Sequence, residues 1–291
     1  GCRIAKRAID KYRAQSDYDS RPLYVAGSIG PSNYVVSSTQ ANLNKGTFDQ
    51  IVDNFYYQVL GLIEGGADVL LIETQQDILE TKAIIIGANK AFAEKKTRLP
   101  MIVQATVDVF SKMQIFNTDI HAAYTAVSGM GIDVFGINCN VGPKEMETTV
   151  EKLSRFCKHP ISVVPNAGQP ISEDGQTCYK LSPEDMANTM EPFVREHGVA
   201  IVGGCCGTTP AHIKALREKL NGVVPALRQP DEKIYVSGPQ EVSAIDSSKG
   251  LLRIGERLNV RGSRLVQDAV ESEGEIAMQV LEEVVNEQVR D

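Results

Sequence analysis

Three cysteines stand at points where apolar runs of the sequence end. Cys205 and Cys206 lie in the glycine-rich stretch 203–207, directly after the apolar run 199–202, and Cys139 ends the run 133–138. Thiolates are soft ligands that suit zinc, and a catalytic zinc site has three protein ligands and one exchangeable position. The three thiols therefore indicate a zinc site with an open position. Three structural thiols buried in a core are the alternative, and the residues alone leave both open.

The cysteine pair also sets a condition on the backbone. Neighbouring side chains of a regular strand point to opposite faces, so Cys205 and Cys206 can reach one point only if the chain leaves strand geometry. The glycines before and after the pair allow such a departure. We expect the pair to lie in a turn just past a strand end, where catalytic residues of barrel enzymes gather.

Three polar residues follow other apolar runs. Glu73 comes after Leu-Leu-Ile at 70–72, so its carboxylate is expected at the same edge of a sheet; an ordinary ion pair or a helix cap is the alternative. Asn138 and Asn166 also fall at expected strand ends. Each could orient a ligand or could satisfy nearby backbone groups.

The elements that must position these residues alternate along the chain. The strand runs are apolar throughout, as in parallel strands covered on both faces, and they recur at spacings typical of repeated βα units. Strands are expected at 23–27, 68–73, 101–107, 133–138, 161–165 and 199–203. Helices are expected at 1–15, 48–64, 76–95, 118–129, 144–157, 183–197 and 210–220. Six such units fit an open six-stranded sheet or a (β/α)₈ barrel without its first two strands equally well.

The character of the sequence changes after residue 220. Residues 221–250 are rich in Pro, Ser, Gly and charge, and are expected to be a linker. A strand-like run at 251–255 and a helix over 264–290 follow. This last piece is too small to form an independent α/β domain, so we expect it to be the first βα unit of something larger.

Composition narrows the class of protein. The chain has 291 residues and a formal net charge of −7 with no basic run, which gives no support to a nucleic-acid surface. No apolar stretch approaches the roughly 20 residues needed to cross a bilayer. The first residues resemble a charged helix and not a secretory signal, and adjacent cysteines in a large chain argue against a disulfide framework. A reducing, cytoplasmic setting is expected.

Four motifs, in this order, resemble the homocysteine S-methyltransferase domain family over roughly residues 1–225. They are Ile-Glu-Thr at 72–74, Gly-Ile-Asn-Cys at 136–139 with Gly-Pro at 142–143, Pro-Asn-Ala-Gly at 165–168, and Gly-Gly-Cys-Cys-Gly-Thr at 203–208. The resemblance implies a (β/α)₈ TIM-type barrel, here apparently lacking its first two strands. It also implies that Cys139, Cys205 and Cys206 bind zinc and that the sulfur of homocysteine takes the fourth position.

The same resemblance implies that Glu73 receives the α-ammonium of the substrate as a catalytic and binding residue, with Asn138 as a second substrate contact. The stretch 254–263 resembles the opening of the pterin-binding domain in the cobalamin-dependent methionine synthase family. Asn259, Gly262 and Ser263 are the implied pterin contacts. The expected organisation is a zinc barrel over 1–225, incomplete at its N-terminus, a linker over 226–250 and a truncated pterin module over 251–291.

The implied reaction is methylation of homocysteine to methionine. Methylcobalamin on another module would donate the methyl group and methyltetrahydrofolate would renew it, so the expected chain is an internal piece of a longer enzyme with little turnover by itself. Two alternatives remain. One is a single-module methyltransferase that uses S-methylmethionine or betaine, and the other is a catalytically silent binding or scaffold fragment.

Overall fold

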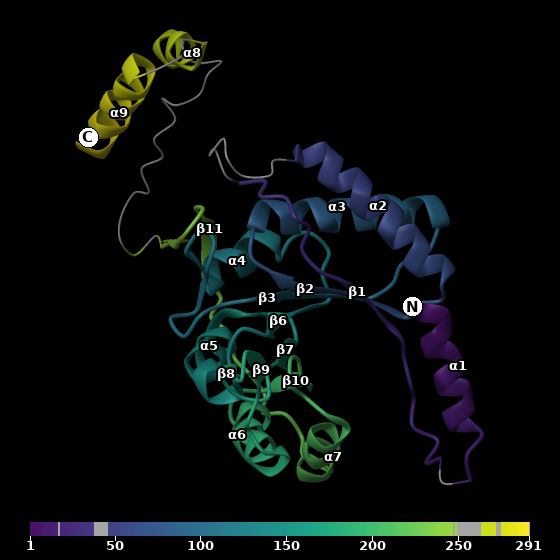
Figure 1. Ribbon diagram of the computed structural model, residues 1–291. Helices are drawn as coiled ribbons and strands as arrows, with labels where there is room; N and C mark the ends of the chain where they lie inside the picture. The colour runs from purple at the N-terminus through teal and green to yellow at the C-terminus, as the bar shows by residue number, and fades with distance from the viewer. Residues whose placement is uncertain (17, 38–45, 247, 249–262, 272–274, 291) are drawn as a thin grey trace. The chain divides into compact units, whose positions relative to one another are not determined.

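The chain divides into two units in a computed structural model that describes residues 1–16, 18–37, 46–246, 248, 263–271 and 275–290. The first unit covers Gly1–Ala244 and the second covers Ile245–Asp291. Figure 1 labels helices of both units and strands of the first.

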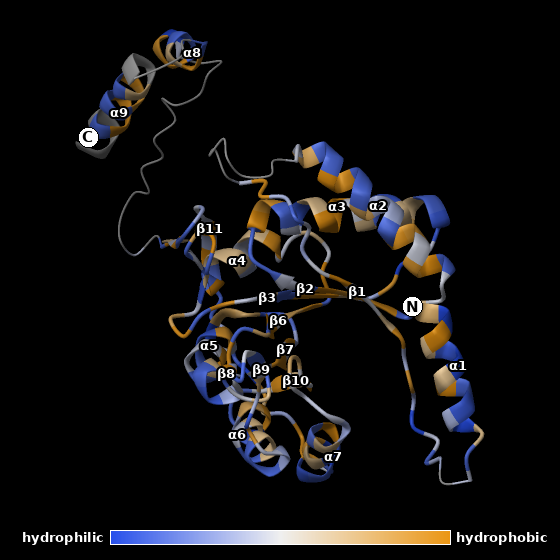
Figure 2. Cartoon of the chain, viewed as in Figure 1, coloured by the Kyte–Doolittle hydropathy of each residue, from blue (hydrophilic) through white to orange (hydrophobic). Residues whose placement is uncertain are grey.

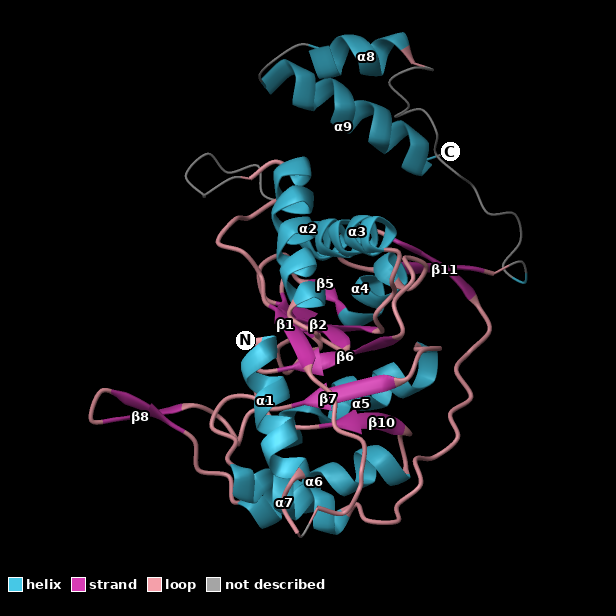
Figure 3. Cartoon of the chain, turned by 90° about the vertical axis from the view of Figure 1, so that its right-hand side faces the viewer, coloured by secondary structure: helices cyan, strands magenta, loops and turns pink. Residues whose placement is uncertain are grey.

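The first unit is built on six parallel strands that neighbour one another in chain order. They are β1 (Ala26–Ile29), β2 (Val69–Gln75), β3 (Met101–Ala105), β6 (Val134–Asn138), β7 (Ile161–Val164) and β10 (Val199–Val202). Each overlaps a strand expected from the apolar runs. Figure 3 shows β7 and β10 side by side. The α/β class with a parallel sheet is therefore confirmed.

Helices connect successive strands and cover the sheet. They are α2 (Phe48–Glu64), α3 (Ile78–Lys95), α4 (Ile120–Val127), α5 (Pro143–Phe156), α6 (Pro183–Arg195) and α7 (Pro210–Lys219). Their starts follow from capping chemistry: the Asp77 side chain accepts backbone N–H groups at the start of α3, and Ser182 does so for α6 ahead of a proline. The apolar core lies between strands and helices, and Figure 2 shows apolar residues along the strands.

A separate apolar cluster joins the first helix to the start of the sheet. Helix α1 (Cys2–Arg13) places Cys2 beside Val25 and Ala67, which precede β1 and β2. Lys6 Nζ lies 2.6 Å from a carboxylate oxygen of Asp68. This end of the strands is opposite to the end that carries the cysteines.

Three two-stranded sheets complete the first unit. They are β4 (Lys112–Met113) with β5 (Thr118–Asp119), β8 (Ile171–Glu173) with β9 (Gln176–Cys178), and β11 (Ile234–Ser237) with β12 (Val242–Ile245). The β8–β9 hairpin projects from the unit between β7 and α6 (Figure 3).

The β11–β12 pair lies within residues that the sequence indicated as a linker. Ser237 Oγ donates to the carbonyl of Ala122 in α4 at 3.0 Å, and Thr118 Oγ1 donates to the carbonyl of Pro239 at 2.8 Å. The hairpin is therefore held against β5 and α4. Sequence reasoning did not predict it because each strand has only four residues and the surrounding segment is rich in Pro, Ser, Gly and charge.

In the second unit, residues 264–290 contain two helices where one was expected. Helix α8 (Arg264–Glu271) buries Val266 and Ala269, and helix α9 (Glu275–Arg290) buries Val284. The two helices contact each other. The strand expected at 251–255 lies outside the described residues.

Candidate metal centre

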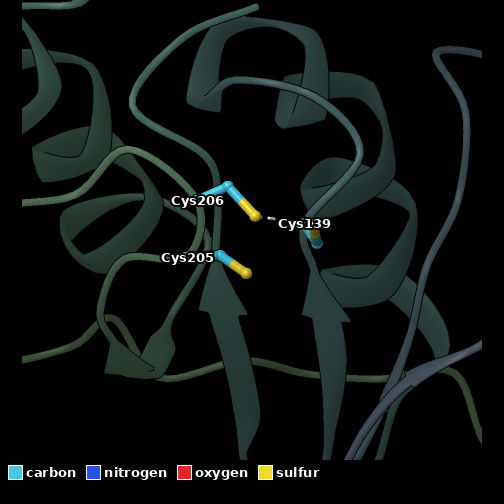
Figure 4. A group of neighbouring side chains, drawn as sticks. All are labelled: Cys139, Cys205 and Cys206. Carbon is cyan, nitrogen blue, oxygen red and sulfur yellow. Dashed lines mark hydrogen bonds between the residues drawn. The ribbon is translucent and has the colours of Figure 1, made fainter. Parts of the chain in front are cut away.

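The sulfur atoms of Cys139, Cys205 and Cys206 meet at one point. All three lie within 4.8 Å of one another, and the sulfurs of Cys139 and Cys206 are 3.6 Å apart. Figure 4 shows the three side chains converging beyond the strand ends. Among the described residues this is the only group of three or more His, Cys, Asp or Glu side chains so arranged.

Cys139 is turned off the end of β6 by an unusual backbone. Its φ is +60° and that of Asn140 is +65°, both in the left-handed region that non-glycine residues seldom occupy. The Cys139 N–H donates to the carbonyl of Val164 at 3.0 Å, and the Val141 N–H donates to the carbonyl of Cys139 at 2.8 Å. These hydrogen bonds fix the turn that aims the thiol at the cysteine pair.

Cys205 and Cys206 lie in a turn between β10 and α7. The strand ends at Val202, and the Cys205 N–H then donates to the carbonyl of Pro165 at 2.7 Å. The Cys206 N–H donates to Asn166 Oδ1 at 3.2 Å. Gly207 has a φ of +76°. The chain thus leaves strand geometry at the pair, as the sequence predicted, and neighbouring thiols reach the same point.

The thiols change one another's acidity. The pKa of Cys139 is lowered to about 5, chiefly by a hydrogen bond from Cys205 and against a smaller opposing effect of burial. The pKa of Cys205 is raised because its thiol donates that hydrogen bond and is partly buried. The cluster therefore stabilises a thiolate on Cys139, which accepts the hydrogen bond of the protonated Cys205.

The cluster has the dimensions of a tetrahedral thiolate site. Zn–S bonds of about 2.3 Å in tetrahedral geometry place two sulfur ligands about 3.8 Å apart. The 3.6 Å between the sulfurs of Cys139 and Cys206 is close to that spacing. Cys206 is exposed, so the site is open to solvent on that side. The residues present therefore fit a metal with three protein ligands and one position for an outside ligand.

Glu73 lies at the same edge of the sheet as the cysteines, since all six strands are parallel. The pairing of β2 with β3 shifts between Ile72 and Gln75, which makes a bulge at Glu73 and Thr74. The Glu73 carboxylate is partly exposed and accepts a hydrogen bond from the Ser28 hydroxyl of β1. Burial along β2 alternates regularly through Glu73 and breaks at Thr74, so the irregularity begins directly after Glu73.

The two asparagines have partners within the protein. Asn138 is fully buried; its Oδ1 accepts from the Thr74 N–H at 2.8 Å and its Nδ2 donates to Thr74 Oγ1 at 2.8 Å. Asn166 is 2% exposed and holds the turn at Cys206. The Asn166 amide therefore holds the backbone at Cys206, whereas the Asn138 amide holds Thr74 of β2.

Sequence reasoning did not single out Thr74 or Tyr179. Thr74 has a φ of +61°, a conformation that no sequence pattern announces. The ring of Tyr179 lies so close to Gly207 that a Cβ there would be 2.4 Å from the ring. The pKa of Tyr179 is raised, first by burial and then by the Cys206 thiol. Tyr179 follows the β8–β9 hairpin, so only the folded chain brings it to the cluster.

The residues expected to contact a pterin are only partly described. Asn259 and Gly262 lie outside the described residues. Ser263 stands at the start of α8, where its hydroxyl accepts the Val266 N–H at 3.4 Å and its carbonyl accepts the Gln267 N–H at 2.9 Å. Ser263 is therefore an N-cap residue of that helix.

The protein is thus of the α/β class, and its candidate metal centre is a cluster of three thiols at the carboxyl edge of a parallel sheet. The family model of homocysteine S-methyltransferase matches residues 1–220. The chain therefore belongs to the homocysteine S-methyltransferase family. This confirms the family indicated by the four motifs.

The relatives include two methionine synthases. That of Mycobacterium tuberculosis is 34% identical over 273 residues, and that of Mycobacterium leprae is 33% identical over 278 residues. Each match covers 94% of this chain and 22% of the relative. The chain thus spans about a fifth of the length of these methionine synthases.

Solved structures support the fold. The apo form of the homocysteine methyltransferase MmuM from Escherichia coli matches with a TM-score of 0.57 and 24% identity, over 75% of this chain and 70% of that one. Its metallated form matches with a TM-score of 0.54 and 23% identity, over 74% and 67%. At this identity the likeness concerns the fold. Within the described part of the chain, no helix is long and apolar enough to cross a membrane.

Proposed function

We propose that this chain binds zinc through Cys139, Cys205 and Cys206 and activates the thiol of homocysteine for methyl transfer, which yields methionine. The observation that carries the proposal is the meeting of three sulfurs, within 4.8 Å of one another, at the carboxyl edge of a parallel sheet. Catalytic residues of barrel enzymes gather at that edge. Membership of the homocysteine S-methyltransferase family supports the substrate.

The donor set suits this chemistry. A free thiol with a pKa near 8.5 is mostly protonated at pH 7, whereas a thiol bound to zinc is deprotonated. Three protein thiolates more than neutralise a divalent ion, so the site keeps a negative charge that leaves an added sulfur electron-rich. The open side at Cys206 is where the substrate sulfur would enter.

Glu73 would hold the other end of homocysteine. Its carboxylate, oriented by the Ser28 hydroxyl, would receive the α-ammonium group. With the amino end held, the sulfur would form a bond to the methyl carbon while the bond between that carbon and the donor breaks. The electron pair of the broken bond would stay with the donor, and the proton of the thiol would already have left to solvent. Holding both ends of a substrate in the reactive geometry raises the reaction rate.

Methylcobalamin, renewed by methyltetrahydrofolate on other modules, is the proposed methyl donor. The match to methionine synthase covers 273 residues and so extends beyond the 220 residues of the family model. This extension favours a methionine synthase over a single-module enzyme that uses S-methylmethionine or betaine. In the same proposal, residues 251–291 begin a pterin module to which Asn259, Gly262 and Ser263 contribute.

We also propose that the six strands belong to a (β/α)₈ barrel that two further strands would close. The strands neighbour one another in strict chain order, which supports this, because in a doubly wound sheet the strand order reverses partway across the sheet. On β1, Ala26 and Ser28 are exposed while the alternate residues Gly27 and Ile29 are buried, as expected of a barrel strand whose inner face is not yet covered.

Metal analysis and calorimetry test the proposal. The purified chain should hold about one zinc per molecule, and binding of homocysteine at pH 7 should release about one proton, measured in buffers of different ionisation enthalpy. Cys206→Ser should lose zinc, whereas Cys178→Ser, outside the cluster, should retain it. Zinc retained by Cys206→Ser, or homocysteine binding without proton release, would contradict the proposal.

The methyl donor is tested separately. The zinc-loaded chain with homocysteine is given methylcobalamin, S-methylmethionine or betaine, and methionine is measured. We expect turnover only with methylcobalamin, and at a low rate. Turnover with S-methylmethionine or betaine would assign the single-module activity instead. Zinc and homocysteine binding with no turnover from any donor would leave the chain a binding fragment.

A further inference from the structure

Thr74 stands in a conformation that its own chemistry disfavours. Its φ is +61°, which for a β-branched residue is a genuine outlier and is a strained conformation. Such a residue persists only where its surroundings hold it. The strain lies within the bulge of β2, directly beside Glu73.

Asn138 supplies the restraint from two strands away. Its amide makes two hydrogen bonds to Thr74, one with the main-chain N–H and one with the hydroxyl, both 2.8 Å long. Asn138 belongs to β6 and Thr74 to β2, so the amide reaches across the end of β3. The carbonyl of Asn138 in turn accepts a hydrogen bond from the hydroxyl of Thr106, the residue directly after β3, at 2.9 Å. Asn138 is fully buried and Thr106 is 3% exposed, so the bond between them is shielded from water, while Thr74 itself is partly exposed.

Thr74 and Asn138 are each adjacent in sequence to a residue of the proposed site. Glu73 directly precedes Thr74, and Cys139 directly follows Asn138. We infer that the Thr74–Asn138 pair is a positioning device that fixes the Glu73 carboxylate relative to the Cys139 sulfur, and thereby selects the length of the α-amino thiol that fits between them. This inference rests on the proposed function, in which Glu73 binds the ammonium end and the metal binds the sulfur.

The chemical consequence is discrimination between homocysteine and cysteine. The two amino thiols differ by one methylene group between the sulfur and the α-carbon. When the Glu73 carboxylate is held at a fixed distance from the metal site, cysteine is too short to contact both at once and is rejected. A difference of one methylene is worth about tenfold or more in a well-defined site. If the bulge is no longer held in place, Glu73 can move toward the metal site and bind cysteine as well. The selectivity for homocysteine over cysteine then falls.

Variants of Thr74 separate positioning from folding. Thr74→Val removes the hydroxyl and leaves a buried donor of Asn138 unpaired, whereas Thr74→Ser keeps the bond. Thr74→Gly removes the steric cost of the positive φ and the hydroxyl together, so it should fold at least as stably as the Val variant. We expect Val and Gly to weaken homocysteine binding roughly tenfold, which corresponds to one unpaired polar group, and Ser to restore it.

Asn138→Leu provides the second arm. The Leu side chain is similar in size and makes neither bond. If Thr74 and Asn138 act as one unit, Asn138→Leu combined with Thr74→Val should bind homocysteine no more weakly than Asn138→Leu alone. Thr149→Val is the matched control, because Thr149 is as buried as Asn138 and its hydroxyl donates to Ser111 Oγ at 2.9 Å instead of to a residue of the site. It should leave both affinities unchanged.

Calorimetric affinities for homocysteine and for cysteine, with zinc content measured on each sample, decide the matter. Weaker homocysteine binding and lower selectivity at full zinc content support the positioning role. Unchanged selectivity, independent effects of the two residues, or zinc lost in step with homocysteine would overturn it. Failure of the unaltered chain to bind zinc would instead refute the proposed function, and this inference with it.

Discussion

The two faces of the six-stranded sheet differ in chemistry although they alternate along the same strands. One face meets the helices and is apolar: Phe135 and Ile137 of β6 are buried, and Phe135 contacts Tyr124 of α4 with ring centroids 5.2 Å apart. The other face carries the row Gln104, Gly136 and Ser162, which lie opposite one another on three neighbouring strands.

That row shows how polar groups are accommodated within apolar runs. Gln104 Nε2 donates to Ser162 Oγ at 2.7 Å, although β6 lies between their strands. The bond can form because Gly136 has no side chain between them. The helix-facing side is thus held by burial of apolar area, while the opposite side is held by specific hydrogen bonds. These hydrogen bonds fix the positions of the polar side chains. The same face of β6 continues from Gly136 to Asn138, which precedes Cys139 at the strand end.

The largest expected effect comes from a single methyl group on the polar face. In Gly136→Ala the added Cβ would lie 1.9 Å from the carbonyl oxygen of Ser162, so the neighbouring strands β6 and β7 must separate. We expect unfolding free energy to fall by about 3 kcal/mol or more, measured by denaturant titration. Gly129→Ala is the control, because nothing lies within 4 Å of its Cβ. A tolerated Gly136→Ala would show that the polar face is not tightly packed.

A smaller effect is expected at the metal turn, and it should appear in metal affinity more than in stability. Gly207 and Gly175 share a φ of +76°, but only at Gly207 would a Cβ collide with Tyr179, at 2.4 Å from the ring. Both alanine variants should lose about 1 kcal/mol of stability from the left-handed backbone. Only Gly207→Ala should also weaken zinc binding, roughly tenfold, in competition with a chelator. If Gly207→Ala and Gly175→Ala bind zinc with equal affinity, the contact between Gly207 and Tyr179 does not influence the metal site.

The smallest effect concerns a carboxylate on the helix side. Glu80 of α3 is 2% exposed, and burial raises its pKa above the ordinary 4.5 although Ser32 donates a backbone hydrogen bond to it at 2.7 Å. The folded state therefore holds a proton that the unfolded state has lost, so stability falls as pH rises from 4.5 through the raised pKa.

Glu80→Gln keeps the acceptor for Ser32 and removes the charge. The variant should match the unaltered chain below pH 4.5 and exceed its Tm at higher pH by about 2 °C. Thermal melting between pH 4 and pH 8 measures this, with the exposed Glu147→Gln as control. A Tm difference that does not change with pH would mean that the charge of Glu80 is not the cause.

Much of the fold followed from the sequence. All six strands of the sheet and the helices between them were predicted, because parallel strands and their covering helices are marked by apolar runs and capping residues close in sequence. The β11–β12 hairpin was not predicted, because its strands are short and are held by contacts to α4, more than 100 residues earlier in the chain.

The sequence by itself determined which thiols stand at strand ends and that the Cys205–Cys206 pair must leave strand geometry, since both follow from local chain chemistry. Only the tertiary structure decided that the three sulfurs meet within 4.8 Å and that Asn138 clamps Thr74. These contacts join residues from separate strands through positive-φ backbone at Thr74 and Cys139. No local pattern encodes them, because packing across the sheet supplies the energy that holds such conformations.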